Sequence, residues 1–325
     1  MKATDKKTIG KTNTQVTRFG LGGANLKNTG VSPNISEMTI QKALSLNVGY
    51  FDTAPLYGDK QSEKNLGKIL PHANRTQFAL STKAGRTYSP GIMSPETAKM
   101  DLSYDGILRS VDSSLKRLSL DKIDILFIHD PDLHPEGRNS GFKQVIEESF
   151  QAAQKLKNDG LINAIGVGMN EWEMPYKFIQ EFDLDCVLQA GRYTLMNQAA
   201  LHPFLDECEK RDVSVITGST LNGGFIFSNM DNNTMMNYQP EIDRNDLTIP
   251  IKGKKIKNIC NSYNVPMISV ALQFPFRHPA VASVLTGTST PEELQENISL
   301  FDITIPKDLW AELESEGLIE EILDL

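Results

Sequence analysis

Short apolar runs alternate with segments of helical periodicity along almost the whole chain. Most of the eight runs lack a strict apolar–polar alternation, which is typical of parallel strands buried on both faces. Between the runs, apolar positions recur with the i, i+3, i+4 spacing of helices that bury one face. The predicted strands are Phe19–Asn25, Tyr50–Ala54, Phe78–Ala84, Ile123–Asp130, Ala164–Met169, Val187–Gly191, Val213–Ser219 and Val281–Gly287.

This alternation, without a linker or a change in composition, favours a single (β/α)8 TIM barrel domain of the α/β class over residues 1–325. A doubly wound open sheet is the alternative. Ahead of the barrel, Thr8-Ile9 and Val16–Phe19 are expected to pair as a short hairpin. Three long connections follow strand ends, at the rim where barrel enzymes build their sites: Gly85–Ser103, Pro131–Gly141 and Thr220–Pro250. We expect the third to be a mobile flap.

Composition and charge narrow the class of protein. The 325 residues are 39% hydrophobic and carry a net charge of −8, which excludes a fibrous or disordered chain. Without a basic stretch, nucleic acid and anionic membranes are poor partners. No apolar run approaches the ~18–20 residues of a membrane span, and no secretory signal follows Met1. Three widely spaced cysteines favour a reducing, cytoplasmic location; the sequence leaves the oligomeric state open.

Several stretches resemble known binding motifs but are incomplete, so they give little evidence of function. Gly166–Glu171 begins like a dinucleotide-binding fingerprint, but a glutamate takes the place of the third glycine. Gly10–Thr12 resembles the end of a phosphate loop without its first glycine. His129 and His134 have no third ligand at a regular spacing, so we expect a polar rim loop there and no metal site.

Four polar residues follow successive predicted strands: Asp52, Tyr57, Lys83 and His129. Each alone is as well explained by a buried ion pair or a hydrogen-bonded core residue. Because parallel strands of a barrel end at one rim, the four together predict a catalytic site.

The chemistry of such a set is specific. A phenol titrates near pH 10, and a neighbouring lysine ammonium stabilises the phenolate and lowers its pKa. Asp52 would keep Lys83 charged, and a neutral His129 would hold the reacting oxygen. Tyr57 would then move a proton on that oxygen while a nicotinamide cofactor carries the hydride.

The stretches Asp52–Gly58 and Ser62–Gly67 resemble the signature of the aldo-keto reductase superfamily, and Lys83 and His129 match its catalytic lysine and histidine. The resemblance extends over nearly the full chain. Within the superfamily, several stretches resemble the aldose 1-dehydrogenase branch, which includes L-fucose and D-threo-aldose dehydrogenases and which pyridoxal 4-dehydrogenase resembles. The stretches that carry this branch resemblance are Ile128–Asp132, Gly166–Glu173, Ala190–Leu195, Ala271–Pro275 and His278–Val284.

The resemblance also implies cofactor contacts. Asn170 and Gln189 match residues that hold the nicotinamide carboxamide. At the position directly before Asn170, this chain has Met169 where the family usually has serine. Gly218 aligns with a tyrosine that stacks on the nicotinamide in many members. The matching pyrophosphate and adenosine segments contain Ser219 and Leu221, and Gly287, Thr288, Glu293, Glu296 and Asn297, respectively.

Around the 2′-phosphate many members have a lysine and an arginine, where this chain has Gly287 and Glu293. A glutamate facing a phosphate is unfavourable, so we expect NAD to be the cofactor, with NADP as the alternative.

The expected activity is oxidation of an aldose of the L-fucose, L-galactose or D-arabinose type at C1 to the lactone. Polar rim residues suit a polyhydroxylated ring, namely Arg86, Asp130, Asp132, His134, Arg192 and Asn222. Two alternatives stay open. One is a pyridoxal 4-dehydrogenase or a general aldehyde or ketone reductase of the same superfamily. The other is a nucleotide-binding regulatory subunit, like the potassium-channel β subunits.

Overall fold

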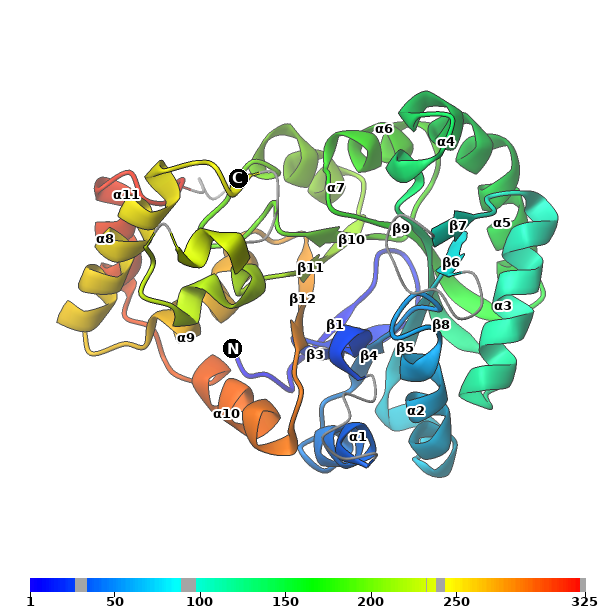
Figure 1. Ribbon diagram of the computed structural model, residues 1–325, viewed down its shortest axis with the longest axis horizontal. Coiled ribbons are helices and arrows are strands. Elements are labelled where there is room, and N and C mark those ends of the chain that lie inside the picture. Colours follow the sequence, from blue (N-terminus) through cyan, green and yellow to red (C-terminus); the bar gives the residue numbers. More distant parts are fainter. Residues whose placement is uncertain (27–33, 89–97, 232, 238–242, 322–325) are drawn as a thin grey trace.

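Eight parallel strands form a closed barrel in the order β10-β11-β12-β3-β4-β5-β8-β9 (Figure 1). The computed structural model describes residues 1–26, 34–88, 98–231, 233–237 and 243–321. All the predicted strands are present, and the closed barrel confirms the predicted fold and excludes an open sheet. The strands are β3 Phe19–Gly22, β4 Tyr50–Asp52, β5 Ala79–Ala84, β8 Ile123–His129, β9 Ile162–Met169, β10 Cys186–Ala190, β11 Ser214–Gly218 and β12 Val281–Gly287.

Helices surround the barrel (Figure 1). Helix α3 illustrates why they form: Ser103 accepts a hydrogen bond from the backbone N–H of Gly106 at its start, and Ile107, Val111 and Leu118 are buried on one face. The described helices are α1 Ile35–Ser45, α2 Gln61–Ile69, α3 Tyr104–Leu118, α4 Arg138–Gln144, α5 Phe150–Asn158, α6 Glu173–Glu181, α7 Asp206–Lys210, α8 Thr248–Ser262, α9 Met267–Gln273, α10 Pro291–Phe301 and α11 Lys307–Ser315.

The predicted N-terminal hairpin is also present. Strand β1 (Lys6–Thr8) pairs with β2 (Gln15–Thr17) in antiparallel register. Ile9 and Val16 are fully buried in one apolar cluster with residues at the starts of barrel strands. The hairpin therefore covers the N-terminal end of the barrel, which leaves the opposite end for a site.

The three long connections begin at the C-terminal ends of β5, β8 and β11. The first contains β6 (Arg86–Tyr88) paired with β7 (Ala98–Met100), and its residues 89–97 lie outside the described residues. The second forms the helical turn Pro131–Leu133 and helix α4. In the third, a helical turn spans Asn222–Phe227, and residues 232 and 238–242 lie outside the described part. The predicted mobile flap therefore stays a prediction.

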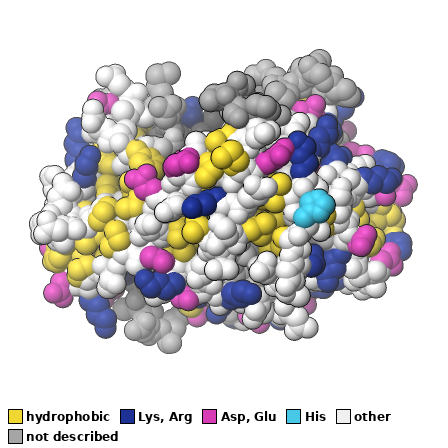
Figure 2. Space-filling view, turned by 90° about the horizontal axis from the view of Figure 1, so that it is seen from below, with side chains coloured by type: hydrophobic (Ala, Val, Ile, Leu, Met, Phe, Trp, Pro, Cys, Tyr) yellow, Lys and Arg dark blue, Asp and Glu magenta, His cyan; other side chains and the backbone are white. Residues whose placement is uncertain are grey.

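The surface shown in Figure 2 carries Lys and Arg side chains interspersed with Asp and Glu. Among the described helices, none combines the length and apolar character that a membrane span requires. The three cysteines are buried and carry free thiols.

Candidate active site

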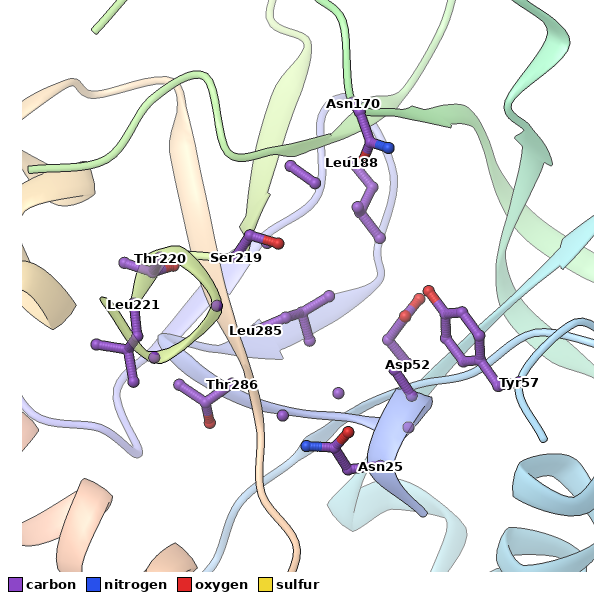
Figure 3. A pocket seen from close by; sticks show the side chains of 18 of the residues that line it. Asn25, Asp52, Tyr57, Asn170, Leu188, Ser219, Thr220, Leu221, Leu285 and Thr286 are labelled. Atoms are coloured by element: carbon purple, nitrogen blue, oxygen red, sulfur yellow. The ribbon is translucent and has the colours of Figure 1, made fainter. Parts of the chain in front are cut away.

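A cavity of about 640 Å³ opens at the C-terminal end of the barrel (Figure 3). Its lining comes from the strand ends and the segments that follow them, and Asp52 and Glu293 are the charged side chains among the described residues that line it. Leu188 and Leu285 contribute apolar surface, and Tyr57 stands at the same side of the cavity as Asp52 in Figure 3. The size is that of a typical small-molecule or cofactor site.

The structure brings together the four residues that the strand ends predicted. The Lys83 ammonium donates to Asp52 Oδ2 at 2.6 Å and to the Thr53 carbonyl at 2.9 Å. The side chains of Lys83 and Asp52 are only 2% and 3% exposed. Burial opposes the charge of Lys83, but the charges of Asp52 and Tyr57 outweigh burial and raise the pKa of the ammonium. Lys83 is therefore a fixed positive charge at neutral pH.

Asp52 is itself held in place. Ser81 donates to Asp52 Oδ1 at 2.6 Å, and the Tyr50 hydroxyl lies 3.0 Å from the Ser81 hydroxyl. Both carboxylate oxygens of Asp52 thus have buried partners, which fixes the position of Lys83 relative to the cavity.

Tyr57 lies against this ion pair, with the Lys83 ammonium 4.7 Å from the centroid of its ring. Burial raises the pKa of the phenol, the charge of Lys83 lowers it, and Asp52 raises it again. The net pKa is above the ordinary value, so the prediction of a lowered pKa is wrong for the protein alone. The predicted effect of Lys83 is present, but desolvation exceeds it.

His129 completes the group. Its ring makes an edge-to-face contact with the Tyr57 ring at 6.2 Å between centroids. Burial, together with the charges of Lys83 and Arg86, moves the pKa of the imidazole well below its usual value. His129 is therefore neutral at physiological pH. One ring nitrogen then donates a hydrogen bond and the other accepts one, and the tautomer decides which is which.

The cavity fits a dinucleotide. Thr220 and Thr286 line it, and their hydroxyl oxygens are buried and have no hydrogen-bond partner in the described structure. A Cβ on Gly23 would lie 2.5 Å from the Asp52 carbonyl oxygen, so only glycine allows the chain to pass so close. That close approach packs Gly23 against β4, and the polar side chains and glycine backbone along the lining suit an extended phosphate-bearing ligand.

The predicted cofactor residues divide into two groups. The group that lines the cavity consists of Asn170, Ser219, Leu221, Gly287 and Glu293. In the other group, Met169 is buried in the core, Thr288 and Asn297 are buried, and Glu296 is exposed on α10; none of these lines the cavity.

Gln189 also lies apart from the cavity lining. Its side-chain amide donates to the Asn170 carbonyl at 3.0 Å and accepts from the Arg192 backbone N–H at 3.1 Å. These bonds hold the two segments beside the cavity in register. Gly218 lines the cavity, so at this position no side chain can stack on a bound ring.

Sequence reasoning missed several lining residues, namely Asn25, Leu188, Thr220, Leu285 and Thr286. They lie in the C-terminal half of β10 and β12 or just after β3 and β11, so position near a strand end was the available signal. The sequence does not reveal which of these side chains have partners and which are free to bind.

The predicted substrate residues are also spread out. Arg86 and Asp130 form a buried ion pair at 2.6 Å beside His129. His134 Nδ1 accepts a hydrogen bond from the Glu136 backbone N–H. Arg192 bridges Glu171 and Asp243, each at 2.8 Å, and so connects two loops.

Two further rim residues differ from one another in their surroundings. Asn222 is fully buried at a backbone φ of 49° and is not part of the cavity lining. Asp132 is half-buried, and one of its oxygens has no hydrogen-bond partner in the described structure. Burial and the charge of Asp130 raise the pKa of Asp132 to about 6.

Residues 18–316 match the Aldo/keto reductase family model. The chain belongs to the aldo/keto reductase family. It is 32% identical to pyridoxal 4-dehydrogenase of Microbacterium luteolum, over 98% of this chain and 99% of that protein. It is 31% identical to D-threo-aldose 1-dehydrogenase of a Pseudomonas species, over 93% and 94% of the two chains. It is 28% identical to L-galactose dehydrogenase of Arabidopsis thaliana, over 97% and 91%.

Solved structures show the same fold. An aldo-keto reductase from Bacillus halodurans superposes with a TM-score of 0.77 at 20% identity, covering 98% of both chains. A glycerol dehydrogenase from Gluconobacter oxydans gives a TM-score of 0.76 at 20% identity, covering 99% of this chain and 98% of that one. The relatives of this aldo/keto reductase are oxidoreductases, and the family uses NAD(P)H.

Proposed function

We propose that this aldo/keto reductase oxidises a small aldose at C1 to the lactone, with NAD as hydride acceptor. The observation that carries the proposal is the Arg86–Asp130 ion pair beside His129, whose side chains are 12% exposed. Asp132, which has an unpaired oxygen, follows in the next turn. Charged donors and acceptors suit a ring with several hydroxyls, whereas an apolar rim suits hydrophobic aldehydes. The names of the Pseudomonas and Arabidopsis relatives support a sugar substrate.

In this proposal the four strand-end residues divide the chemistry. Tyr57 accepts the proton of the C1 hydroxyl, and the Lys83 ammonium stabilises the phenolate that does so. Asp52 keeps Lys83 charged and in position. His129 donates a hydrogen bond to the reacting oxygen, which holds C1 at the cavity.

A bound nicotinamide supplies the acceptor for the hydride that leaves C1. Asn170, Thr220, Thr286 and the backbone around Gly23 are the groups that would hold the dinucleotide. Glu293 lines the cavity, and the described lining contains no lysine or arginine. A 2′-phosphate would therefore approach a carboxylate without a neighbouring cation, and this supports NAD rather than NADP.

A second candidate is oxidation of pyridoxal, supported by the end-to-end similarity to the Microbacterium enzyme. Pyridoxal and aldoses share a chemical feature, since each closes into a cyclic hemiacetal whose oxidation gives a lactone. Reduction of general aldehydes or ketones needs no such ring. A purely regulatory, nucleotide-binding role would not need the contacts among Asp52, Lys83, Tyr57 and His129.

The test is a turnover screen of the purified protein with NAD and with NADP. The panel contains L-fucose, L-galactose, D-arabinose, D-glucose, pyridoxal and a simple open-chain aldehyde, with lactone formation followed by mass spectrometry. We expect turnover of at least one of the first three sugars, with D-glucose far slower because a misplaced hydroxyl leaves buried polar groups unpaired. Oxidation of pyridoxal without any active sugar would assign the protein to the second candidate. Absence of turnover with every compound, despite binding of the nucleotide, would support regulation.

A further inference from the structure

Three side chains form a buried polar cluster where β8 ends. Arg86 Nη1 donates to Asp130 Oδ2 at 2.6 Å, and the same oxygen lies 3.5 Å from Nε2 of His129. The His129 side chain is 7% exposed and that of Asp130 is 12% exposed. One carboxylate oxygen therefore faces both the guanidinium and the imidazole.

The backbone at Asp130 is shaped for this contact. Its φ of 45° and ψ of 52° lie in the left-handed region, which is unfavourable for a residue with a side chain. Successive side chains of a strand point to opposite faces, so an extended Asp130 would direct its carboxylate away from the His129 ring. The left-handed turn instead leaves the carboxylate beside it. The backbone N–H of Asp130 donates to the Gly168 carbonyl at 3.0 Å, which holds the turn against β9.

The nitrogens of His129 have different surroundings. Nδ1 is buried and has no hydrogen-bond partner in the described part of the chain. Nε2 faces the Asp130 carboxylate, which can only accept a hydrogen bond. A neutral imidazole in these surroundings places its single proton on Nε2. At 3.5 Å the contact with Asp130 is longer than an ordinary hydrogen bond, so Nε2–H can also donate to a substrate oxygen.

Arg86 has a separate effect on the same ring. A carboxylate alone beside an imidazole favours the protonated, cationic form. The groups that face His129 are Lys83 from β5, Arg86 from β6, Asp130 from its own turn and the Tyr57 ring from the segment after β4. Arg86 pairs with the carboxylate nearest to the ring, so the charge that would protonate His129 is cancelled.

We propose that Asp130 and Arg86 are positioning residues for His129: Asp130 places the imidazole proton on Nε2, and Arg86, by pairing with Asp130, helps burial and Lys83 to keep the imidazole neutral. The proposal rests on the proposed function, in which His129 donates to the reacting oxygen. It gives the Arg86–Asp130 pair a second role, which acts through His129, besides the polar surface that the pair offers to the sugar.

The first experiment reads His129 directly. The chain has five histidines, so 15N-labelled imidazoles can be followed by NMR in the protein without substrate, with His129→Gln to assign the signal. We expect wild-type His129 to show the Nε2–H neutral form without titrating between about pH 6 and 8. In Arg86→Met the pKa of His129 should rise, so the protonated form should appear at a higher pH than in wild type in a series extended below pH 6, and Arg86→Lys should restore the wild-type behaviour. Asp130→Leu should give a mixture of tautomers, while Asp130→Asn, which keeps an acceptor oxygen, should retain Nε2–H.

A matched control lies at the other end of the same strand. Arg75 and Asp124 form an ion pair of the same type, also at 2.6 Å, near the start of β8. Arg75→Met and Asp124→Asn should leave the His129 signal unchanged. If they alter it as strongly as the rim variants, the effect is general to the fold and the proposal is wrong.

The second experiment measures turnover. Arg86→Met should lower kcat for oxidation by at least about tenfold near pH 6, with a smaller loss near pH 8, and Arg86→Lys should reduce this pH-dependent loss. A role limited to binding the sugar would raise KM equally at both pH values. A wild-type His129 with its proton on Nδ1, or an Arg86→Met signal identical to wild type, would overturn the proposal whatever the substrate. Failure of the sugar screen with the expected NMR result would instead overturn only the substrate assignment.

Discussion

The two ends of strand β8 carry the same pair of residue types with different surroundings. Near its start, Asp124 binds Arg75 at 2.6 Å, accepts the Leu80 backbone N–H at 2.8 Å and contacts the Asn163 amide. After its end, Asp130 binds Arg86 at the same distance but shares that oxygen with His129, whose other nitrogen has no partner in the described structure.

This difference indicates that the N-terminal end of the barrel serves stability and the C-terminal end serves chemistry. At the N-terminal end, the Asp124 carboxylate has its hydrogen bonds within the protein, and the neighbouring hairpin buries Ile9 and Val16. At the C-terminal end, polar atoms of His129, Thr220 and Thr286 are buried without partners, which costs stability unless a ligand satisfies them. These three unpaired groups lie at the functional end of the barrel, while Thr14 is unpaired at the opposite end.

The largest expected effect is at the rim. Tyr57→Phe removes the proton acceptor and keeps the packing of the ring against His129, so kcat for oxidation should fall by about 10² to 10⁴. Nucleotide affinity, measured by fluorescence titration, should stay nearly unchanged. Lys83→Met acts through the same phenolate, so the double variant should lose little more than the more damaging single one. Retention of more than a tenth of wild-type turnover in Tyr57→Phe would exclude this role for Tyr57.

The second effect is pH dependence. Burial raises the pKa of Tyr57, and oxidation needs the phenolate, so kcat/KM for oxidation should rise with pH, by up to about tenfold per unit through the neutral range. Reduction needs the protonated phenol and should stay flat until alkaline pH and then fall. His129, with its pKa well below the usual value, should add no further inflection near pH 6.5. Rates in both directions, measured across a pH series, check these slopes; an oxidation rate that falls with rising pH would contradict them.

The third effect concerns nucleotide choice. Glu293 lines the cavity, and Glu293→Arg should narrow the preference for NAD over NADP in kcat/KM by about fivefold to tenfold, or ~1 kcal/mol. Glu296→Arg is the matched control, since Glu296 is exposed on the same helix and does not line the cavity. A wild-type enzyme that already prefers NADP would contradict the role given to Glu293. Because Glu293 also accepts the Ser289 backbone N–H, thermal unfolding of the variant should be measured alongside.

The smallest expected effect on turnover is at the opposite end of β8. Asp124→Asn keeps the shape of the side chain but weakens its ion pair with Arg75, which is partly exposed. We expect a loss of about 1–2 kcal/mol in the free energy of unfolding, measured by urea denaturation, with kcat within about twofold of wild type. A large loss of kcat at unchanged stability would remove the distinction between the two ends.

Much of the fold could be predicted from the sequence, because strands buried on both faces have continuous apolar sequences. The errors are at element ends: the predicted strand from Phe19 stops at Gly22, since Gly23–Asn25 turn into a short helical segment beside the cavity. The predicted loop Thr220–Pro250 also ends too late, because α8 begins at Thr248. A proline in the first helical turn is tolerated, so Pro250 is not a sign of loop there.

The site was predictable where position alone decides it. Asp52 and His129 end strands and Lys83 is the last residue but one of β5, so barrel geometry brings them together. The hydrogen-bond partners of individual side chains were not predictable. Gln189 uses its amide to hold neighbouring backbone, whereas the Thr220 and Thr286 hydroxyls have no partner in the described structure. The net pKa of Tyr57 also depends on how desolvation compares with the charge of Lys83, which residue identity alone does not give.

The pairing that closes the barrel has a consequence for synthesis of the chain. Strand β3 hydrogen-bonds to β12, with Phe19 opposite Val284. The first barrel strand therefore has no partner on this edge until the last strand has been synthesised. At about 5–20 residues per second on the ribosome, that interval is on the order of ten seconds or longer. Throughout it, β3 presents an unpaired edge that other nascent chains can contact. A ribosome that stalls before β12 emerges therefore leaves a chain with open edges and a high tendency to aggregate.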